Sequence, residues 1–160
     1  MSDDIYKRMK ADYDAARKDR DEAGDLRDKV KVAALNVVLA DAEGIAKKRP
    51  KVEDRGVTNF DVIKVLKESI NTAKENVVTW DRQGRDSGPI HHEIAILKAY
   101  LPEEVDLDEV RAAARDFADN DAVKANPRAG QGIVINKLKE RYGERYDKAW
   151  SAIVRDVIGV

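Results

Sequence analysis

Two adjacent histidines followed by a glutamate, His91-His92-Glu93, are the residues of this chain that come nearest to a metal site. A helical zinc site of the His-Glu-x-x-His kind needs two imidazoles one turn apart on one face of a helix. Here the residue one turn after His92 is Ile96, and adjacent residues on a helix point about 100° apart. The spacing therefore predicts no metal site, and both histidines are expected in a first helical turn or at the surface.

Other catalytic arrangements are missing from the sequence too. No serine stands in a Gly-x-Ser-x-Gly turn, and no Gly-x-x-x-x-Gly-Lys-Ser/Thr phosphate loop occurs. The Gly-Gln-Gly at 130–132 lacks the preceding strand that a dinucleotide site requires. Carboxylates are abundant, but abundance on helix surfaces does not make a catalytic pair. The sequence therefore indicates no catalytic residue and no cofactor, and an enzyme acting by itself is not predicted.

Basic side chains near the C-terminus are the strongest binding feature of the sequence. Residues 124–160 carry eight Lys and Arg against four Asp and Glu, a net charge of +4, whereas residues 91–123 have a net charge of −6. Clustered cations attract a phosphate backbone, so this asymmetry indicates an end that faces nucleic acid. Solvated helix faces without a ligand are the simpler alternative. The candidate phosphate-binding residues are Lys137, Lys139, Arg141, Arg145, Lys148 and Arg155.

These cations are expected on two helices. Lys137 lies one turn before Arg141 on a predicted helix of about 133–142. A last helix is predicted at about 146–158, and its Tyr146 is expected in the core, with stacking on a base as the less favoured role. The outer face of that last helix is predicted to carry Arg145, Lys148 and Arg155.

The elements that position these residues are predicted to be helices throughout. The chain has 160 residues, of which 42% are hydrophobic and 38% charged, so it can build a lean core. Apolar residues recur at three- and four-residue steps, and the alternation typical of strands is absent. The sequence therefore predicts an all-α fold. The seven expected helices span about 3–23, 25–48, 59–82, a segment that Ser87 caps and Pro102 ends, and about 107–119, 133–142 and 146–158.

Cap and break residues mark several of the expected helix ends. The basic stretch 47–56 contains Pro and Gly and is predicted to separate two helices. Thr58 or Asn59 is expected to cap the helix that follows. Asp106 with Glu109 three residues later is an acidic variant of the capping box, which predicts a helix start there.

The sequence shows no feature of a membrane or secreted protein. No window approaches the roughly 18 consecutive apolar residues that a membrane span needs. The first residues are charged and lack the apolar region of a signal peptide. There is no cysteine, which suits a reducing compartment. We therefore expect a cytoplasmic protein without a membrane partner.

The stretch GRDSGPIHHEIAILKAYLPEEVDLDEV, residues 84–110, resembles the signature of the YqeY-type family, also called GatB/YqeY. In that family a turn with Gly, Arg and Asp leads into a helix bearing Glu, Ile and Leu. The helix ends in Tyr-Leu-Pro, and a helix with an acidic cap follows. The resemblance covers nearly the whole chain and is strongest over 60–105. The matching positions are Gly84, Arg85, Asp86, Glu93, Ile94, Leu97, Tyr100, Leu101 and Pro102.

The resemblance implies an N-terminal helical bundle of residues 1–101 and a small three-helix C-terminal module of residues 102–160. Tyr100-Leu101-Pro102 is then a structural joint between the two, and the double histidine is incidental. From composition alone, the polar stretch 119–132 is the best candidate for a module boundary. Arg85 is expected to have a structural role at its turn, in preference to a place on a surface that meets RNA.

The family is related to the tail of the amidotransferase B subunit, which contacts tRNA and helps to position it for transamidation. Similar modules are appended to a tRNA synthetase. The resemblance therefore implies a non-catalytic, tRNA-binding accessory module linked to glutamine-dependent tRNA amidation. An amidotransferase, an aminoacyl-tRNA synthetase or another protein is the implied protein partner.

The C-terminal module departs from the family pattern. The family has a Gly-Lys-Val-Met-like segment and an Ala-Asp-Gly turn where this chain has GQGIVINKLKERYGERYDKAW, so only the opening glycine and the helical pattern carry over. The alternative function is a protein–protein adaptor without RNA binding. In that hypothesis the amphipathic helix at 59–82 and the acidic segment 91–123 dock a basic partner.

Overall fold

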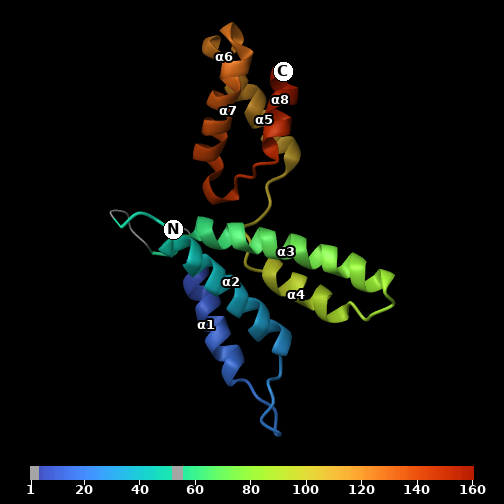
Figure 1. Cartoon of the computed structure of the whole chain (residues 1–160). Coiled ribbons are helices and arrows are strands. Elements are labelled where there is room, and N and C mark those ends of the chain that lie inside the picture. The colour runs from blue at the N-terminus through green and yellow to red at the C-terminus, as the bar shows by residue number, and fades with distance from the viewer. Residues whose placement is uncertain (1–3, 52–55) are drawn as a thin grey trace. The chain divides into compact units, whose positions relative to one another are not determined.

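The computed structural model describes residues 4–51 and 56–160, and these are built from helices (Figure 1). Within them there are eight α-helices and one 3₁₀ turn, and the only strand-like pairing is an isolated bridge between Arg20 and Leu26. The predicted all-α class is confirmed. The chain divides into two compact units, which we call unit 1 (Met1–Leu101) and unit 2 (Pro102–Val160).

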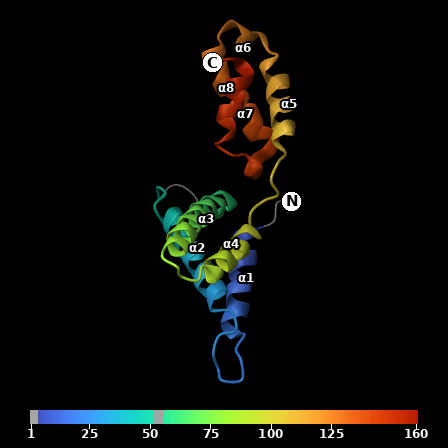
Figure 2. The ribbon, with the colours of Figure 1, turned by 90° about the vertical axis from the view of Figure 1, so that its right-hand side faces the viewer.

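Unit 1 contains four helices. Helix α1 packs along α2, and α4 packs along both α3 and α2 (Figures 1 and 2). Their buried side chains form one core, in which Met9, Leu35, Leu66 and Leu97 have no exposed surface. The four helices are α1 (Ile5–Lys18), α2 (Lys29–Lys47), α3 (Asn59–Arg82) and α4 (Gly88–Lys98).

Helix α3 has the bounds that its apolar periodicity predicts. Thr58 caps it, because the Asp61 N–H donates to the Thr58 hydroxyl and the Thr58 N–H donates to the Asp61 carboxylate. Asn59, the other predicted cap, is the first helical residue, and its side chain accepts a bond from the Ile5 N–H. Arg49, from the predicted break at 47–56, pairs with the buried Asp61. Residues 52–55 of that break lie outside the described residues.

The first two helices are shorter than predicted. Helix α1 ends at Lys18 where the prediction extended to 23, and α2 begins at Lys29 where the prediction began at 25. Between them Asp21 accepts bonds from the N–H groups of Ala23 and Asp25, and Gly24 adopts a φ of 84°. Aspartate side chains compete with the helix for backbone donors, and glycine permits the left-handed turn.

Unit 2 packs α5 against α7 and α8, with the short α6 lying on α7 (Figures 1 and 2). Val110, Val134, Leu138 and Val154 are fully buried between these helices. The elements are α5 (Leu107–Ala118), α6 (Asp121–Ala125), α7 (Pro127–Tyr142), the 3₁₀ turn η1 (Gly143–Arg145) and α8 (Trp150–Ile158).

The polar stretch 119–132, one of the two candidates for a module boundary, lies inside unit 2 and is mostly helical. Asn120 caps α6 by accepting from the Ala122 N–H, and Asn126 caps α7 by accepting from the Ala129 N–H. Pro127 fits the first turn of α7, because proline has no N–H to satisfy there. The prediction of a link at 119–132 was therefore wrong, and α7 begins six residues before the predicted 133.

The structure differs from the predicted cap at Ser87 and from the Glu109 half of the capping box predicted at Asp106. Ser87 precedes α4 but does not cap it, since its hydroxyl donates to Asp81 Oδ1 at 2.6 Å. Asp106 caps α5 by accepting from the Asp108 N–H, while the Glu109 carboxylate accepts from the Tyr142 hydroxyl at 3.0 Å. The Ser87 hydroxyl and the Glu109 carboxylate thus bond to residues of other helices, and the local sequence pattern does not reveal these bonds.

Candidate functional site

The predicted phosphate-binding residues are distributed over three elements of unit 2. Lys137, Lys139 and Arg141 belong to the C-terminal half of α7. Arg145 lies in the turn η1 and Lys148 in the turn before α8, so only Arg155 of the three is on the last helix. The prediction that Arg145, Lys148 and Arg155 share one face of that helix was wrong, because α8 begins at Trp150.

Two of the six cations, Lys137 and Arg145, contact α5 or the segment before it. Lys137 is half-buried, and its ammonium lies 5.6 Å from the centre of the Phe117 ring on α5. Arg145 donates from Nε to the backbone oxygen of Glu103 at 3.2 Å, so it ties η1 to the segment before α5. Both residues have a structural role in addition to any contact with a ligand.

The other four cations, Lys139, Arg141, Lys148 and Arg155, are exposed, and we call them the α7–α8 cations. None of them forms an ion pair with a residue that the structure describes, whereas Arg111 on α5 is paired with Asp156 at 2.5 Å. Lys139 and Arg141 are two residues apart, so they point to nearly opposite sides of α7. An RNA chain that contacted both would have to pass around the end of this helix.

Aromatic rings support the end of α7. The Lys139 ammonium lies 5.4 Å from the centre of the Tyr146 ring, and Tyr146 packs edge-on against Trp150 at 5.4 Å. Tyr142 meets the same Trp150 edge-on at 5.2 Å. Burial, and then the neighbouring Asp147, raise the pKa of Tyr146 above its ordinary value. Tyr146 is half-buried, which leaves part of its ring for contact with a base.

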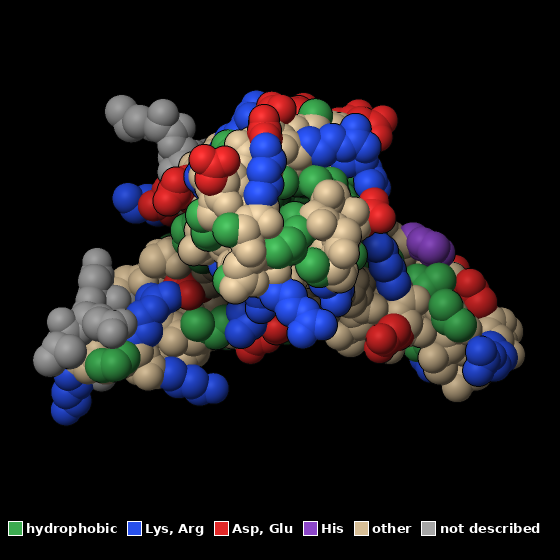
Figure 3. Space-filling view, turned by 90° about the horizontal axis from the view of Figure 1, so that it is seen from above, with side chains coloured by type: hydrophobic (Ala, Val, Ile, Leu, Met, Phe, Trp, Pro, Cys, Tyr) green, Lys and Arg blue, Asp and Glu red, His purple; other side chains and the backbone are tan. Residues whose placement is uncertain are grey.

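The folded unit does not keep the charge asymmetry of the sequence. Unit 2 contains ten Lys and Arg and twelve Asp and Glu, a net charge of −2, because the acidic α5 packs against α7 and α8. Figure 3 shows basic and acidic side chains interspersed on the face in view. Any nucleic-acid interface must therefore use a local group of cations, since the net charge of unit 2 is not positive.

The turn before α4 is held together by its own side chains. The Arg85 guanidinium lies 3.8 Å from the centre of the Trp80 ring, and the Arg85 N–H donates to the Trp80 carbonyl at 2.9 Å. Asp86 accepts from the Gly88 N–H at the start of α4. Arg85 thus stacks on Trp80 of α3 and does not cap that helix with its side chain.

Tyr100 fixes the end of α4 within unit 1. Its ring is buried, and its hydroxyl donates to the Asp12 carboxylate of α1 at 2.5 Å. Burial, followed by this bond to an acceptor, raises the pKa of Tyr100 far above 10. Leu101 packs on the core of unit 1, and Pro102 is the first residue of unit 2. The Tyr-Leu-Pro sequence therefore anchors α4 and contains the division between the two units.

The two histidines are exposed in the first half of α4. His92 is not incidental, because its Nε2 lies 2.9 Å from Oδ2 of Asp28, the cap of α2. Burial alone would raise the pKa of Asp28, but its bonds with the Lys31 N–H and His92 outweigh burial and lower it. Within residues 4–51 and 56–160, no three His, Asp or Glu side chains come together in a way that could hold a metal ion.

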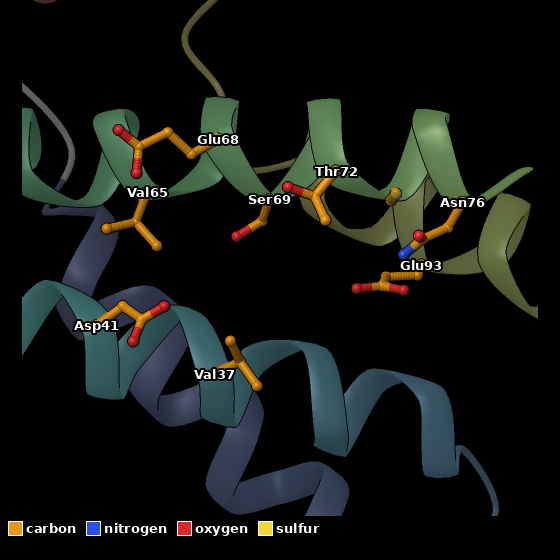
Figure 4. Close-up of a pocket in the computed structure, with 9 residues that line it drawn as sticks. Val37, Asp41, Val65, Glu68, Ser69, Thr72, Asn76 and Glu93 are labelled. Atoms are coloured by element: carbon orange, nitrogen blue, oxygen red, sulfur yellow. The ribbon is translucent and has the colours of Figure 1, made fainter.

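Glu93 points into a hollow between α2 and α3 (Figure 4). Its side chain is half-buried and has no hydrogen-bond or ion-pair partner among the described residues, and burial raises its pKa. The sequence identified Glu93 only as a residue of the α4 motif. Residues of three helices line the hollow around this carboxylate, and helical periodicity does not show where helices meet.

The described residues thus define an all-α protein with a four-helix N-terminal unit and a smaller helical C-terminal unit that presents exposed cations. The family described as Yqey-like protein matches residues 7–158, nearly the whole chain, so this chain belongs to the YqeY family. The resemblance noted in the sequence is confirmed by this match. A comparison with curated proteins finds none that matches. None of the helices in the described residues combines the length and the apolar character that a bilayer-spanning helix requires.

Proposed function

We propose that this member of the YqeY family is a non-catalytic accessory protein that binds tRNA through unit 2 and serves glutamine-dependent tRNA amidation. The α7–α8 cations, Lys139, Arg141, Lys148 and Arg155, supply the phosphate contacts. The observation that carries the proposal is that all four are exposed and form no ion pair with a described residue. Their charges are therefore available to a ligand without the loss of an ion pair, and Lys139 and Arg141 also lie over the rings of Tyr146 and Tyr142.

The arrangement suits a single-stranded or looped part of an RNA. Lysine and arginine neutralise phosphates and release counterions, which supplies affinity without sequence preference. The half-buried Tyr146 beside Lys139 adds a ring on which an unpaired base can stack. Lys137 and Arg145 assist from positions where Phe117 and the Glu103 carbonyl already hold them.

The link to amidation rests on the family. The YqeY family resembles the tRNA-contacting tail of the amidotransferase B subunit, and a separate tail-like protein would hold or deliver the tRNA while another enzyme performs the chemistry. This part of the proposal is tested in a reconstituted amidation reaction. Addition of the protein is expected to change the rate at which an amidotransferase forms the amide on charged tRNA, and no change would contradict the link.

Binding itself is tested by fluorescence anisotropy of labelled tRNA titrated with the full chain at about 50 and 200 mM salt, the range over which phosphate contacts lose most affinity. Two double variants divide the cations: Lys139→Glu with Lys148→Glu, and Arg141→Glu with Arg155→Glu. The matched control is Lys64→Glu with Lys74→Glu on α3 of unit 1. These two lysines are also exposed, and the control changes the net charge by the same amount.

The wild-type protein is expected to bind tRNA and to lose affinity steeply between the two salt concentrations. Each unit-2 pair that contacts phosphate should flatten the log–log salt slope by about 1.4–1.8, since one contact contributes about 0.7–0.9. Equal weakening by the control pair would show diffuse attraction and refute the assignment to unit 2. Flat titrations at both salt concentrations would refute tRNA binding and leave the adaptor as the function.

A further inference from the structure

A groove lies between α2 and α3 of unit 1, with residues of α4 along its side (Figure 4). It consists of two adjoining hollows of about 350 and 360 Å³. Val37 of α2, Ser69 and Asn76 of α3 and Glu93 of α4 line both hollows, so the two are continuous. All three helices are packed on the core of unit 1, and the groove is thus a feature of a single folded unit.

The second hollow is largely apolar. Val30 and Val37 line it from α2, Trp80 lines it from the end of α3, and Pro89 lines it from the start of α4. Val37 lies in the middle of α2 and is 52% exposed, whereas the hydrophobic residues on the core-facing side of the same helix are buried. This row of side chains is therefore an apolar strip that the residues of unit 1 cover only in part, since Arg85 stacks on the Trp80 ring while Val37 stays exposed.

The carboxylates that line the groove are not matched by cations. Asp41, Glu68 and Glu93 line the first hollow, and no Lys or Arg of the described chain lines either hollow. None of the three carboxylates has a hydrogen-bond or ion-pair partner among the described residues. Unit 1 as a whole has twenty Lys and Arg against nineteen Asp and Glu, so the acidic lining is local.

Burial in the groove affects the charge of the Glu93 carboxylate. Desolvation by the surrounding helices raises the pKa of its carboxyl group, so the charged form is destabilised in the free protein. A cation placed in the groove would remove this penalty. The negative lining also disfavours a phosphate backbone here, which separates this surface from the α7–α8 cations.

We propose that this groove binds a basic amphipathic helix from a partner protein. The apolar side of that helix lies on Val37 and Trp80, and its lysine or arginine side chains meet Asp41, Glu68 and Glu93. The groove residues of α3 run from Val65 to Trp80, which is about 22 Å at 1.5 Å per residue. A helix of about four turns fits this length and completes the packing of α2 and α3 as a further bundle helix.

The test uses a labelled 16-residue helical peptide with leucines at i, i+3, i+4 and i+7 spacing and lysines elsewhere, titrated with the full chain. A second peptide keeps the leucines and replaces every lysine by glutamate. The charge variant is Asp41→Asn with Glu93→Gln, and its matched control is Asp14→Asn with Glu75→Gln, two exposed carboxylates outside the groove. The apolar variant is Val37→Ser.

The control for Val37→Ser is Val78→Ser on α3, because Val78 is similarly exposed (56%) and lines neither hollow. The lysine peptide is expected to bind, and both groove variants should weaken binding roughly fivefold, through lost ion pairs in one case and lost apolar contact in the other. The control variants should bind as the wild type does, and the glutamate peptide should not bind.

Three results would overturn the proposal. The lysine peptide fails to bind, or the groove variants bind it as tightly as the wild type, or both peptides bind equally, which would show apolar adhesion without charge recognition. The groove proposal does not rest on tRNA binding by unit 2. The groove variants change other residues than the α7–α8 cations, and the peptide probe contains no phosphate.

Discussion

Replacement of Gly130 by alanine is expected to destabilise unit 2, although alanine is the better helix former. Gly130 is buried in α7 where α6 crosses it. A Cβ atom at this position would lie 2.7 Å from the Cα atom of Val123 and 2.7 Å from its Cγ1. A side chain could rotate away from such a contact, but the Cα atom belongs to the backbone, so α6 itself would have to move.

The same helix supplies a control. Gly132 also lies in α7, and nothing lies within 4 Å of the Cβ that alanine would add there. Alanine gains about 1 kcal/mol over glycine in a helix interior, so Gly132→Ala should stabilise the protein by about this amount. At Gly130 the same gain is opposed by an overpacking cost of about 1–3 kcal/mol. The difference between the two variants therefore measures the overpacking cost alone.

The comparison is made by thermal and urea unfolding of the full chain. Each kcal/mol should shift the midpoint by about 4–8 °C for a unit of this size. Hydrogen exchange followed by mass spectrometry assigns the change to peptides of unit 2. If Gly130→Ala proved as stable as Gly132→Ala, then α6 and α7 would not approach as closely as described, and the reasoning would be refuted.

Three further predictions concern titrating groups of unit 1. The bonds of Asp61 with Thr58 and Arg49 outweigh its burial and lower its pKa below the ordinary 3.8. The charged carboxylate should therefore stabilise unit 1 at neutral pH, and this contribution should be lost as the pH falls below 3.8. Asp61→Asn should remove this part of the acid unfolding curve followed by circular dichroism, and an unchanged curve would contradict it. Tyr100→Phe should cost about 1 kcal/mol in urea unfolding, because the bond to Asp12 is lost, and a neutral result would show that this bond contributes nothing. Burial raises the pKa of Glu93 above 4.5, so Glu93→Gln should stabilise unit 1 at pH 7, with the gain shrinking as acid protonates the wild-type carboxylate; equal stability at pH 7 would argue against the desolvation.

Much of the fold follows from local patterns. The all-α class and the bounds of α3 come from apolar residues at three- and four-residue steps and from a Thr58 cap, and both depend only on neighbours along one helix. Helix α6 was missed although a signal existed. Asn120 and the Asn126-Pro127 pair are typical helix starts, and their polarity was interpreted as a link.

The site could be predicted only in part. The sequence named the six cations of the C-terminal segment, but it placed three of them on one helix face. It did not indicate that Phe117 contacts Lys137 or that the Glu103 carbonyl accepts from Arg145. It also assigned this end a net positive charge. Packing of the acidic α5 against α7 and α8 gives unit 2 a net charge of −2, because charge in a folded unit sums over segments distant in sequence.

By itself the sequence determined the all-α class, most of the helices and the family. Tertiary structure alone decided which side chains meet. Tyr100 bonds Asp12 across 88 residues, His92 meets Asp28 across 64, and Glu93 faces a groove formed by two other helices. The physical reason is that helix formation is governed by residues within a turn or two, whereas pockets and long-range bonds depend on how the chain returns past itself.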